Sequence, residues 1–142
     1  MVHQCRLVHV PIPREHVVGT ALTWLPFIER IAKRTRCSVV EHVAEIERGD
    51  VLLHLAWEPE EKQAYALAGT RIFLRAGKPF ARIVWLWGRA RQHWQPLLPV
   101  LEQYHCDTLG CVGMAIDAPP YWQRALESEG YRTTHHIMEK DF

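Results

Sequence analysis

Hydrophobic and polar positions change their period several times along the chain, and each change predicts a new element. Residues 5–12 alternate loosely and end at two prolines, which predicts a strand. From Arg14 to Ala32, apolar residues recur at steps of three and four, which is the helical period. Pro26 interrupts this stripe, and proline inside a helix costs about 3 kcal/mol. We therefore expect two helices that meet near Leu25.

The middle of the chain predicts a sheet. A short amphipathic helix over residues 39–47 comes first. Three apolar runs follow, separated by short turns, at residues 51–57, 63–77 and 80–88. Short turns join neighbouring strands in an antiparallel meander, and Gly69 predicts a bulge in the second strand. In the third strand, Trp85 and Trp87 share one face and Leu86 takes the other.

The last third of the chain alternates between helix and strand patterns. It predicts a helix over residues 94–105, a strand over 108–116, a helix that opens at Pro119 or Pro120, and a closing strand over 132–140. The sequence contains no internal repeat, low-complexity tract or linker. It therefore predicts one α/β domain over residues 1–142, with helices flanking a mixed sheet.

Composition and charge narrow the function classes. The 142 residues are 48% hydrophobic and 23% charged, and 17 Lys and Arg against 16 Asp and Glu give a net charge of +1. Such a balance makes nucleic acid an unlikely partner, and the basic run from Arg30 to Arg36 is typical of a solvated helix face. No apolar run has the ~20 residues that span a bilayer. Four separated cysteines and an N-terminus without a signal-peptide pattern favour reduced thiols and a cytoplasmic location.

The end of the chain carries a family resemblance. Ala125, Gly130, Tyr131, Met138 and Lys140 loosely fit the closing helix, Gly-aromatic step and strand of the GNAT acyltransferases, which the whole order of elements also resembles. The resemblance implies a mixed sheet that opens beside acyl-CoA. Members of the family close with a two-strand hairpin, whereas only 12 residues follow Gly130 here. The resemblance therefore predicts a GNAT-like sheet truncated at its C-terminal hairpin.

Two functional elements of that family are missing from the sequence. Members hold the CoA pyrophosphate on a Q/R-x-x-G-x-G/A loop, but the matching stretch here is "WGRARQHW", where Gly88 is the sole glycine and bulky side chains run from Arg89 to Trp94. Leu126 stands where many members have a tyrosine that protonates the CoA thiolate, and Pro119 stands where they have an asparagine. Both losses favour a protein without CoA and without catalysis.

The leading hypothesis from the sequence is a non-catalytic structural or interaction module. The pattern also resembles the GNAT-like internal proteins of short-tailed bacteriophages, which implies a virion location and protein partners or a homo-oligomer. The alternative is a transferase that moves an acyl group from acetyl-CoA to a small amine. In that case Gly88, Arg89 and Arg91 would bind CoA. The candidate acid-base residues would be Glu58, Glu60, Tyr121 and Tyr131.

Other chemistry-bearing residues carry weaker signals. Six tryptophans are many for 142 residues, and we expect Trp94, Trp122 and His135 to contribute to an interaction surface. A metal site would need Cys106, Cys111, His105 and His136 to converge in the folded chain, but no ligand-spacing motif accompanies them, so we expect none. The closing strand would leave an unpaired edge, which predicts that another subunit covers residues 133–138.

Overall fold

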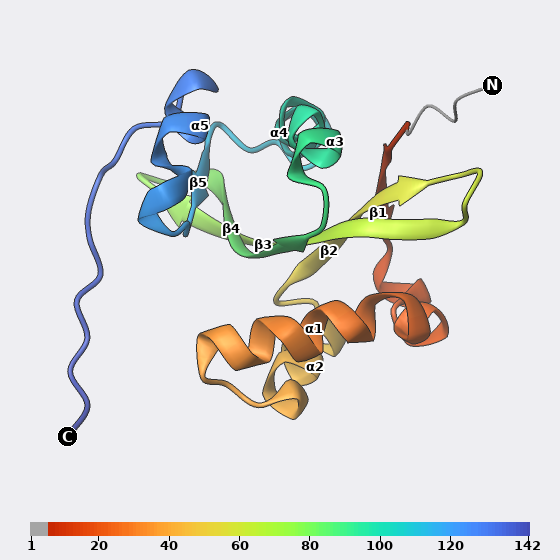
Figure 1. The fold of residues 1–142 in the computed structure, drawn as a ribbon. Coiled ribbons are helices and arrows are strands. Elements are labelled where there is room, and N and C mark those ends of the chain that lie inside the picture. Colours follow the sequence, from red (N-terminus) through yellow and green to blue (C-terminus); the bar gives the residue numbers. More distant parts are fainter. Residues whose placement is uncertain (1–5) are drawn as a thin grey trace.

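A computed structural model describes residues 6–142 as a five-stranded sheet in the order β1-β2-β3-β4-β5 (Figure 1). The first four strands pair antiparallel and β5 pairs parallel to β4, so the sheet is mixed, as the sequence predicts. Its strands are β1 (Val8–Ile12), β2 (Leu52–Glu58), β3 (Gln63–Arg75), β4 (Lys78–Gly88) and β5 (Met114–Ile116).

Helices cover both faces of the sheet (Figure 1). One face carries α1 (Ala21–Thr35) and α2 (Val39–Glu47), and the other carries α3 (Arg91–Trp94), α4 (Leu98–Asp107) and α5 (Gln123–Ser128). Single 3-10 turns precede several of them, at Arg14–His16, Val18–Thr20, Gln95–Leu97 and Pro120–Trp122. The predicted opening of the last helix at Pro120 is confirmed by the turn that leads into α5.

Strand alternation separates two apolar layers. Under α1 and α2, Leu53 of β2, Leu67 of β3 and Trp85 of β4 are buried in one cluster. On the opposite face, Ala68 and Ile83 pack against α4. Trp87 packs on the first layer and Leu86 on the second, so the predicted division of these side chains between two faces is confirmed.

Pro26 lies inside a single helix, so the prediction of two helices meeting near Leu25 is wrong. The missing N–H of Pro26 removes one hydrogen bond, to the carbonyl of Leu22 in the first turn. Leu22 is 94% exposed, so water can reach this end of the helix. Burial of Trp24, Ile28 and Ile31 then outweighs the cost of the proline.

A bulge interrupts β4 near its middle. Thr70 of β3 lies opposite Ile83, but the adjacent Gly69 lies opposite Trp85, so Val84 is an extra residue on β4. The predicted irregularity at Gly69 is therefore confirmed, with the additional residue on the neighbouring strand. Because of the bulge, Ile83 and Trp85 face opposite layers although they are two residues apart.

Gly69 is required by this packing, and its replacement by alanine is expected to destabilise the fold by about 1–3 kcal/mol. A Cβ atom there would lie 2.6 Å from Cε3 of Trp85 and 2.9 Å from Cγ1 of Val51, and both side chains are buried. Chemical denaturation would measure the loss. Gly19→Ala is the matched control, because a Cβ at Gly19 meets no atom within 4 Å. Equal losses in the two variants would contradict this account.

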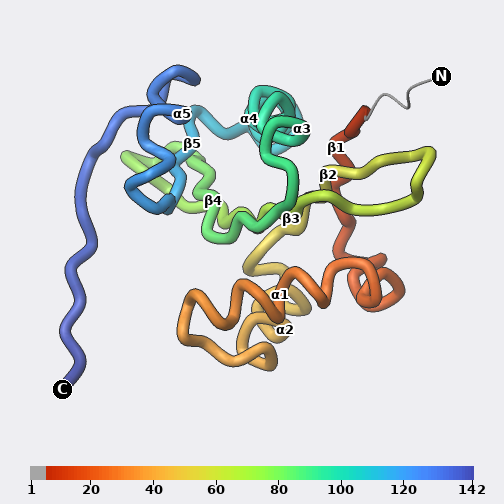
Figure 2. The backbone as a smooth tube through the Cα atoms, viewed as in Figure 1, coloured from red at the N-terminus to blue at the C-terminus, as the bar shows by residue number. Residues whose placement is uncertain are grey.

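The C-terminal third differs most from the prediction. The strand expected over residues 108–116 is limited to the three residues of β5, and no strand forms over 132–140. Residues 132–142 are exposed and extend past the sheet, where Asp141 pairs with Arg36 at 2.9 Å (Figure 2). Ile137 and Met138 are adjacent and would point to opposite sides of a strand, so residues 132–140 have no continuous apolar face to bury. The predicted strand is therefore wrong, and the expected subunit contact along residues 133–138 stays a prediction.

The described residues carry no helix that is long and apolar enough to cross a membrane.

Cys37, Cys106 and Cys111 are free thiols, and Cys5 lies outside the described residues. His105 is buried and His136 is exposed, so the structure does not bring them together. Within residues 6–142, no group of three or more metal-ligating side chains converges.

Candidate active site

The first candidate for a ligand-binding feature is the side of β4 that faces β5, from Val84 to Gly88. We call it the open β4 edge. β5 pairs with β4 only from Ala81 to Ile83, and the last bond between them joins the amide of Asp117 to the carbonyl of Ile83 at 3.1 Å. Beyond that point no strand among residues 6–142 pairs with this side of β4. Unpaired strand edges present N–H and C=O groups to a ligand or a chain. The bulge at Val84 lies where this edge begins.

The turn after β4 does not contain the phosphate loop of the family. Trp94 is 6% exposed and packs against Gly88, where a Cβ atom would lie 2.7 Å from the indole Nε1. Gly88 therefore makes room for a tryptophan, and no cradle for phosphate forms there. Ala90 adopts a left-handed conformation (φ 54°) before the four residues of α3.

Arg89 and Arg91 leave this turn as exposed side chains. Arg89 donates to Gln63 at 2.8 Å and stacks over the ring of Tyr65, while Arg91 lies over the ring of Trp122 at 5.7 Å from its centroid. Both side chains are exposed in the turn after β4, Arg89 above the start of β3 and Arg91 beside Trp122. They can bind a phosphate through charge and hydrogen bonds without a glycine loop.

Tyr131, a candidate acid, is already committed to another contact. Its hydroxyl donates to a carboxylate oxygen of Glu102 in α4 at 2.6 Å. Burial raises the pKa of Tyr131, and the hydrogen bond to Glu102 raises it further, so the phenol keeps its proton. Leu126 packs against the apolar layer beneath α4. Tyr121 is 72% exposed on the turn before α5.

Glu58 and Glu60 lie at the end of β2 and in the turn to β3, and β3 separates β2 from β4. Glu58 is 1% exposed, and its carboxylate accepts from the amides of Arg6 at 3.0 Å and Glu60 at 2.8 Å. Those bonds hold the turn in place. The structure therefore does not bring these two carboxylates to the open β4 edge, and their catalytic roles stay predictions.

Two of the three residues expected at an interaction surface contact each other. Trp94 is buried and stacks on Trp122 with ring centroids 5.3 Å apart, so these two rings pack on each other. His135 lies in the exposed C-terminal segment and contacts the hydroxyl of Thr134 at 3.0 Å. The part of these three side chains in an interaction stays a prediction.

A buried chain of polar side chains crosses the sheet beneath α4, and we call it the histidine–threonine network. His9 Nε2 and His54 Nδ1 lie 3.0 Å apart, and His54 Nε2 lies 3.0 Å from Thr70 Oγ1. Thr70 Oγ1 lies 2.9 Å from His105 Nε2, and His105 Nδ1 lies 2.8 Å from the carbonyl of Leu101. The network thus joins β1, β2 and β3 to α4.

The carbonyl at the end of the network fixes its proton positions. A carbonyl oxygen only accepts, so His105 carries a hydrogen on Nδ1 and accepts from the Thr70 hydroxyl at Nε2. The oxygen of Thr70 then accepts from Nε2–H of His54, whose Nδ1 accepts from Nε2–H of His9. All of these bonds form together while the three imidazoles are neutral.

Burial favours these neutral forms. Desolvation lowers the pKa of His54 well below its usual value, and the charges of His105 and His9 lower it further. The pKa values of His9 and His105 are also lowered, mainly by burial. A cavity of about 50 Å³ lies beside His9 and His54, and its other walls are apolar. The histidine–threonine network is therefore a set of uncharged polar side chains surrounded by apolar ones.

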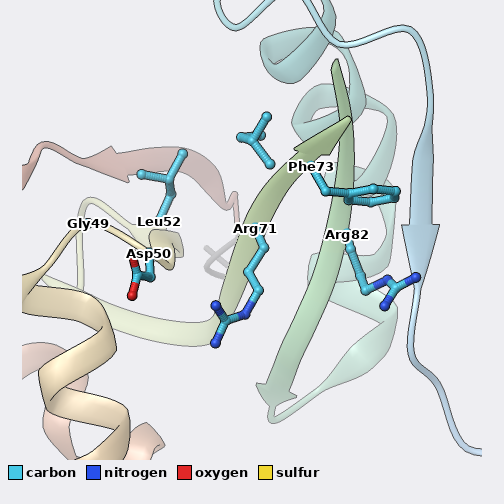
Figure 3. A pocket seen from close by; sticks show the side chains of 7 residues that line it. Gly49, Asp50, Leu52, Arg71, Phe73 and Arg82 are labelled. Atoms are coloured by element: carbon cyan, nitrogen blue, oxygen red, sulfur yellow. The ribbon is translucent and has the colours of Figure 1, made fainter. Parts of the chain in front are cut away.

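A larger cavity of about 420 Å³ lies on the opposite face of β3 and β4, on the side of α2 (Figure 3). Arg71 and Phe73 of β3 and Arg82 of β4 line it on one side, and Gly49, Asp50 and Leu52 line it on the other. Arg71 and Arg82 are directly opposite each other in the strand register. We call this cavity the arginine groove.

Sequence reasoning missed both the network and the groove. Successive members of the network are 45, 16 and 35 residues apart, so no spacing motif joins them. One signal was available, since His54 interrupts the apolar run "VLLHLAW" and a buried polar residue needs a partner. Arg71 and Arg82 meet only through the register of β3 and β4, which a sequence pattern does not specify.

Several solved structures that superpose on this chain are acetyltransferases. An aminoglycoside N-acetyltransferase in complex with CoA superposes with a TM-score of 0.71 at 14% identity over 100% of this chain and 98% of that one. The chain has the GNAT fold. Glucosamine-6-phosphate N-acetyltransferase from Arabidopsis thaliana matches with a TM-score of 0.63 at 15% identity, over 96% and 98% of the two chains.

An aminoglycoside 6'-N-acetyltransferase from Acinetobacter baumannii likewise matches with a TM-score of 0.63 at 16% identity, over 96% of this chain and 97% of that one. No protein-family model matches the sequence, and no curated protein matches it. The predicted GNAT-like α/β fold is therefore confirmed at the level of structure. In this version of the GNAT fold, no strand follows α5 within the described residues.

Proposed function

We propose that this protein is a CoA-dependent N-acyltransferase that acts on a small amine. The observation that carries the proposal is the open β4 edge, which begins at the Val84 bulge where β5 stops pairing. The acetyltransferase identity of the structural neighbours also supports it. A non-catalytic module would have no need of an unpaired edge inside its own sheet, since such edges are normally covered.

The residues at this edge fit an acyl-CoA. The pantetheine arm carries two amide groups, and an extended amide chain can hydrogen-bond to an unpaired strand edge in the manner of an added strand. Arg89 and Arg91 lie in the turn that follows β4, and their exposed guanidinium groups suit the pyrophosphate, in place of a glycine loop. Trp94 fills the space at Gly88, so the pyrophosphate would lie further out than a glycine loop would hold it.

The reaction needs little from acid-base side chains. Acyl-CoA supplies an activated acyl group as a thioester. The neutral amine nitrogen attacks the carbonyl carbon, an N–C bond forms, the C–S bond breaks, and the nitrogen loses one proton as the sulfur gains one. Leu126 offers no proton to the thiolate, so water or the attacking amine supplies it. The chain's contribution is to orient the thioester along β4 and to admit the amine beside the bulge.

Calorimetric titration with acetyl-CoA tests the proposal, with micromolar binding expected. The Arg89→Ala, Arg91→Ala double variant should bind at least tenfold more weakly, because each guanidinium–phosphate contact is worth about 1.5–3 kcal/mol. The matched control is Arg124→Ala, Arg132→Ala, which removes the same charge from exposed positions. Incubation with acetyl-CoA and a library of small amines should release free CoA.

The competing hypothesis, a non-catalytic structural or interaction module, predicts no binding in the same titration. It draws on the missing glycine loop and on Leu126, and its phage-virion form gains no support from the neighbours named above. Absence of binding at millimolar acetyl-CoA would reject the transferase. Equal weakening in the two double variants would reject the assignment of Arg89 and Arg91.

A further inference from the structure

The arginine groove and the open β4 edge share strand β4, and the groove residue Arg82 comes shortly before the edge begins. Arg82 is two residues before the bulge residue Val84 and pairs with Ala115 of β5. Arg71 contacts Glu45 of α2, so the groove lies on the face of the sheet that α1 and α2 cover. An amine that reaches the bulge from this face would pass along the groove.

The two arginines are an unfavourable pair unless something compensates them. Residues directly opposite each other in antiparallel strands point to the same face, and like charges there repel. In Figure 3 the two side chains diverge from the strands, Arg71 towards the side where Asp50 lies and Arg82 away from it. Glu45 neutralises Arg71, and Asp50 is held by Arg48 at 2.9 Å.

Arg82 is the incompletely paired member. Its Nε is buried and has no hydrogen-bond partner among residues 6–142. The closest carboxylate is that of Asp117, whose oxygen lies 4.0 Å from Nε, beyond hydrogen-bond distance. The guanidinium lies over the ring of Phe73 at 5.1 Å from its centroid. The Arg82 side chain is 34% exposed, so an anionic ligand in the groove can pair with the exposed part of this guanidinium and offset its charge.

We propose that the arginine groove is an anion-recognition site, in which Arg82, flanked by Arg71, binds a carboxylate or phosphate group of the acceptor amine. The identification of the ligand as an acceptor rests on the proposed function, whereas the binding of an anion rests on the groove alone. A planar guanidinium presents parallel donors to carboxylate and phosphate oxygens. The volume of about 420 Å³ is large enough for a small charged amine.

Binding of matched ligand pairs tests the proposal without acetyl-CoA. Phosphoethanolamine is compared with ethanolamine, and β-alanine with β-alaninamide, by NMR titration of the amides of residues 49–52 and 71–73 and of the arginine Nε–H signals. The anionic member of at least one pair should bind at least tenfold more tightly than its neutral counterpart and shift the Arg82 Nε–H signal. The phosphate and carboxylate arms show which anion is preferred.

Variants then locate the site. Arg82→Gln should abolish the preference for the anion, and Arg82→Lys should keep part of it as a point charge. Arg132→Gln removes the same charge from an exposed position and should leave the preference unchanged. Equal binding of charged and neutral members by the unmodified protein would overturn the proposal, as would equal effects of Arg82→Gln and Arg132→Gln. Because no thioester is present, failure of the transferase proposal would leave this result intact, and the reverse also holds.

Discussion

Replacing Thr70 by valine is expected to destabilise the protein by about 2–5 kcal/mol. Valine keeps the branched shape but removes the hydroxyl that joins His54 to His105. The Nε2–H of His54 and the Nε2 of His105 would then be buried without partners, and each such group costs about 1–3 kcal/mol. Both histidines are at most 3% exposed, so water cannot easily replace the bond. Urea denaturation would measure the change in the free energy of unfolding.

Two further variants separate the hydroxyl from packing. Thr70→Ser keeps the hydroxyl and loses one methyl group, which costs about 1 kcal/mol. Thr133→Val makes the same chemical change as Thr70→Val in the exposed C-terminal segment, where we expect a change within about 0.5 kcal/mol. If the valine variant at position 70 were as stable as the serine variant, the network would contribute nothing measurable to folding.

Stability is also expected to fall steeply as the pH decreases below about 6.5. The pKa values of His9, His54 and His105 are lowered in the folded protein, so the unfolded chain binds more protons in this range. The stabilisation is fully present above the ordinary histidine pKa of about 6.5 and is lost as the pH decreases towards the lowered values. Each buried histidine contributes a slope of up to about 1.4 kcal/mol per pH unit in that window.

Proton uptake on unfolding is the direct measurement of this effect. The free energy of unfolding is measured by urea denaturation at several values between pH 7.5 and 5, and its slope gives the number of protons bound. Carboxylates also contribute to this slope, so the comparison is between variants. His54→Gln and His105→Gln should each reduce the uptake by up to one proton. Unchanged uptake in both variants would mean that these imidazoles do not titrate on unfolding.

Within the fold, local patterns determined the elements wherever burial gave them a clear period. The apolar runs of β2, β3 and β4 and the short turns between them were enough to predict the meander, and the order of elements pointed to the GNAT fold. Where two local rules competed, prediction failed. The proline rule ended a helix at Leu25, but burial of Trp24 and Ile28 on either side of Pro26 held one helix together. At residues 132–140, alternation without an apolar face did not make a strand.

The sequence by itself determined the class of fold, the missing glycine loop and the leucine in place of an acid. Only the tertiary structure decided which side chains meet. The histidine–threonine network joins residues from three strands and a helix, and the two arginines of the groove face each other because a single register aligns β3 with β4. The physical reason is that hydrogen bonds and charges act over a few ångströms, while the chain brings together residues that are tens of positions apart. A local pattern determines which face of a helix or strand is buried. Which side chains of other elements contact that face depends on how the elements pack in the folded protein.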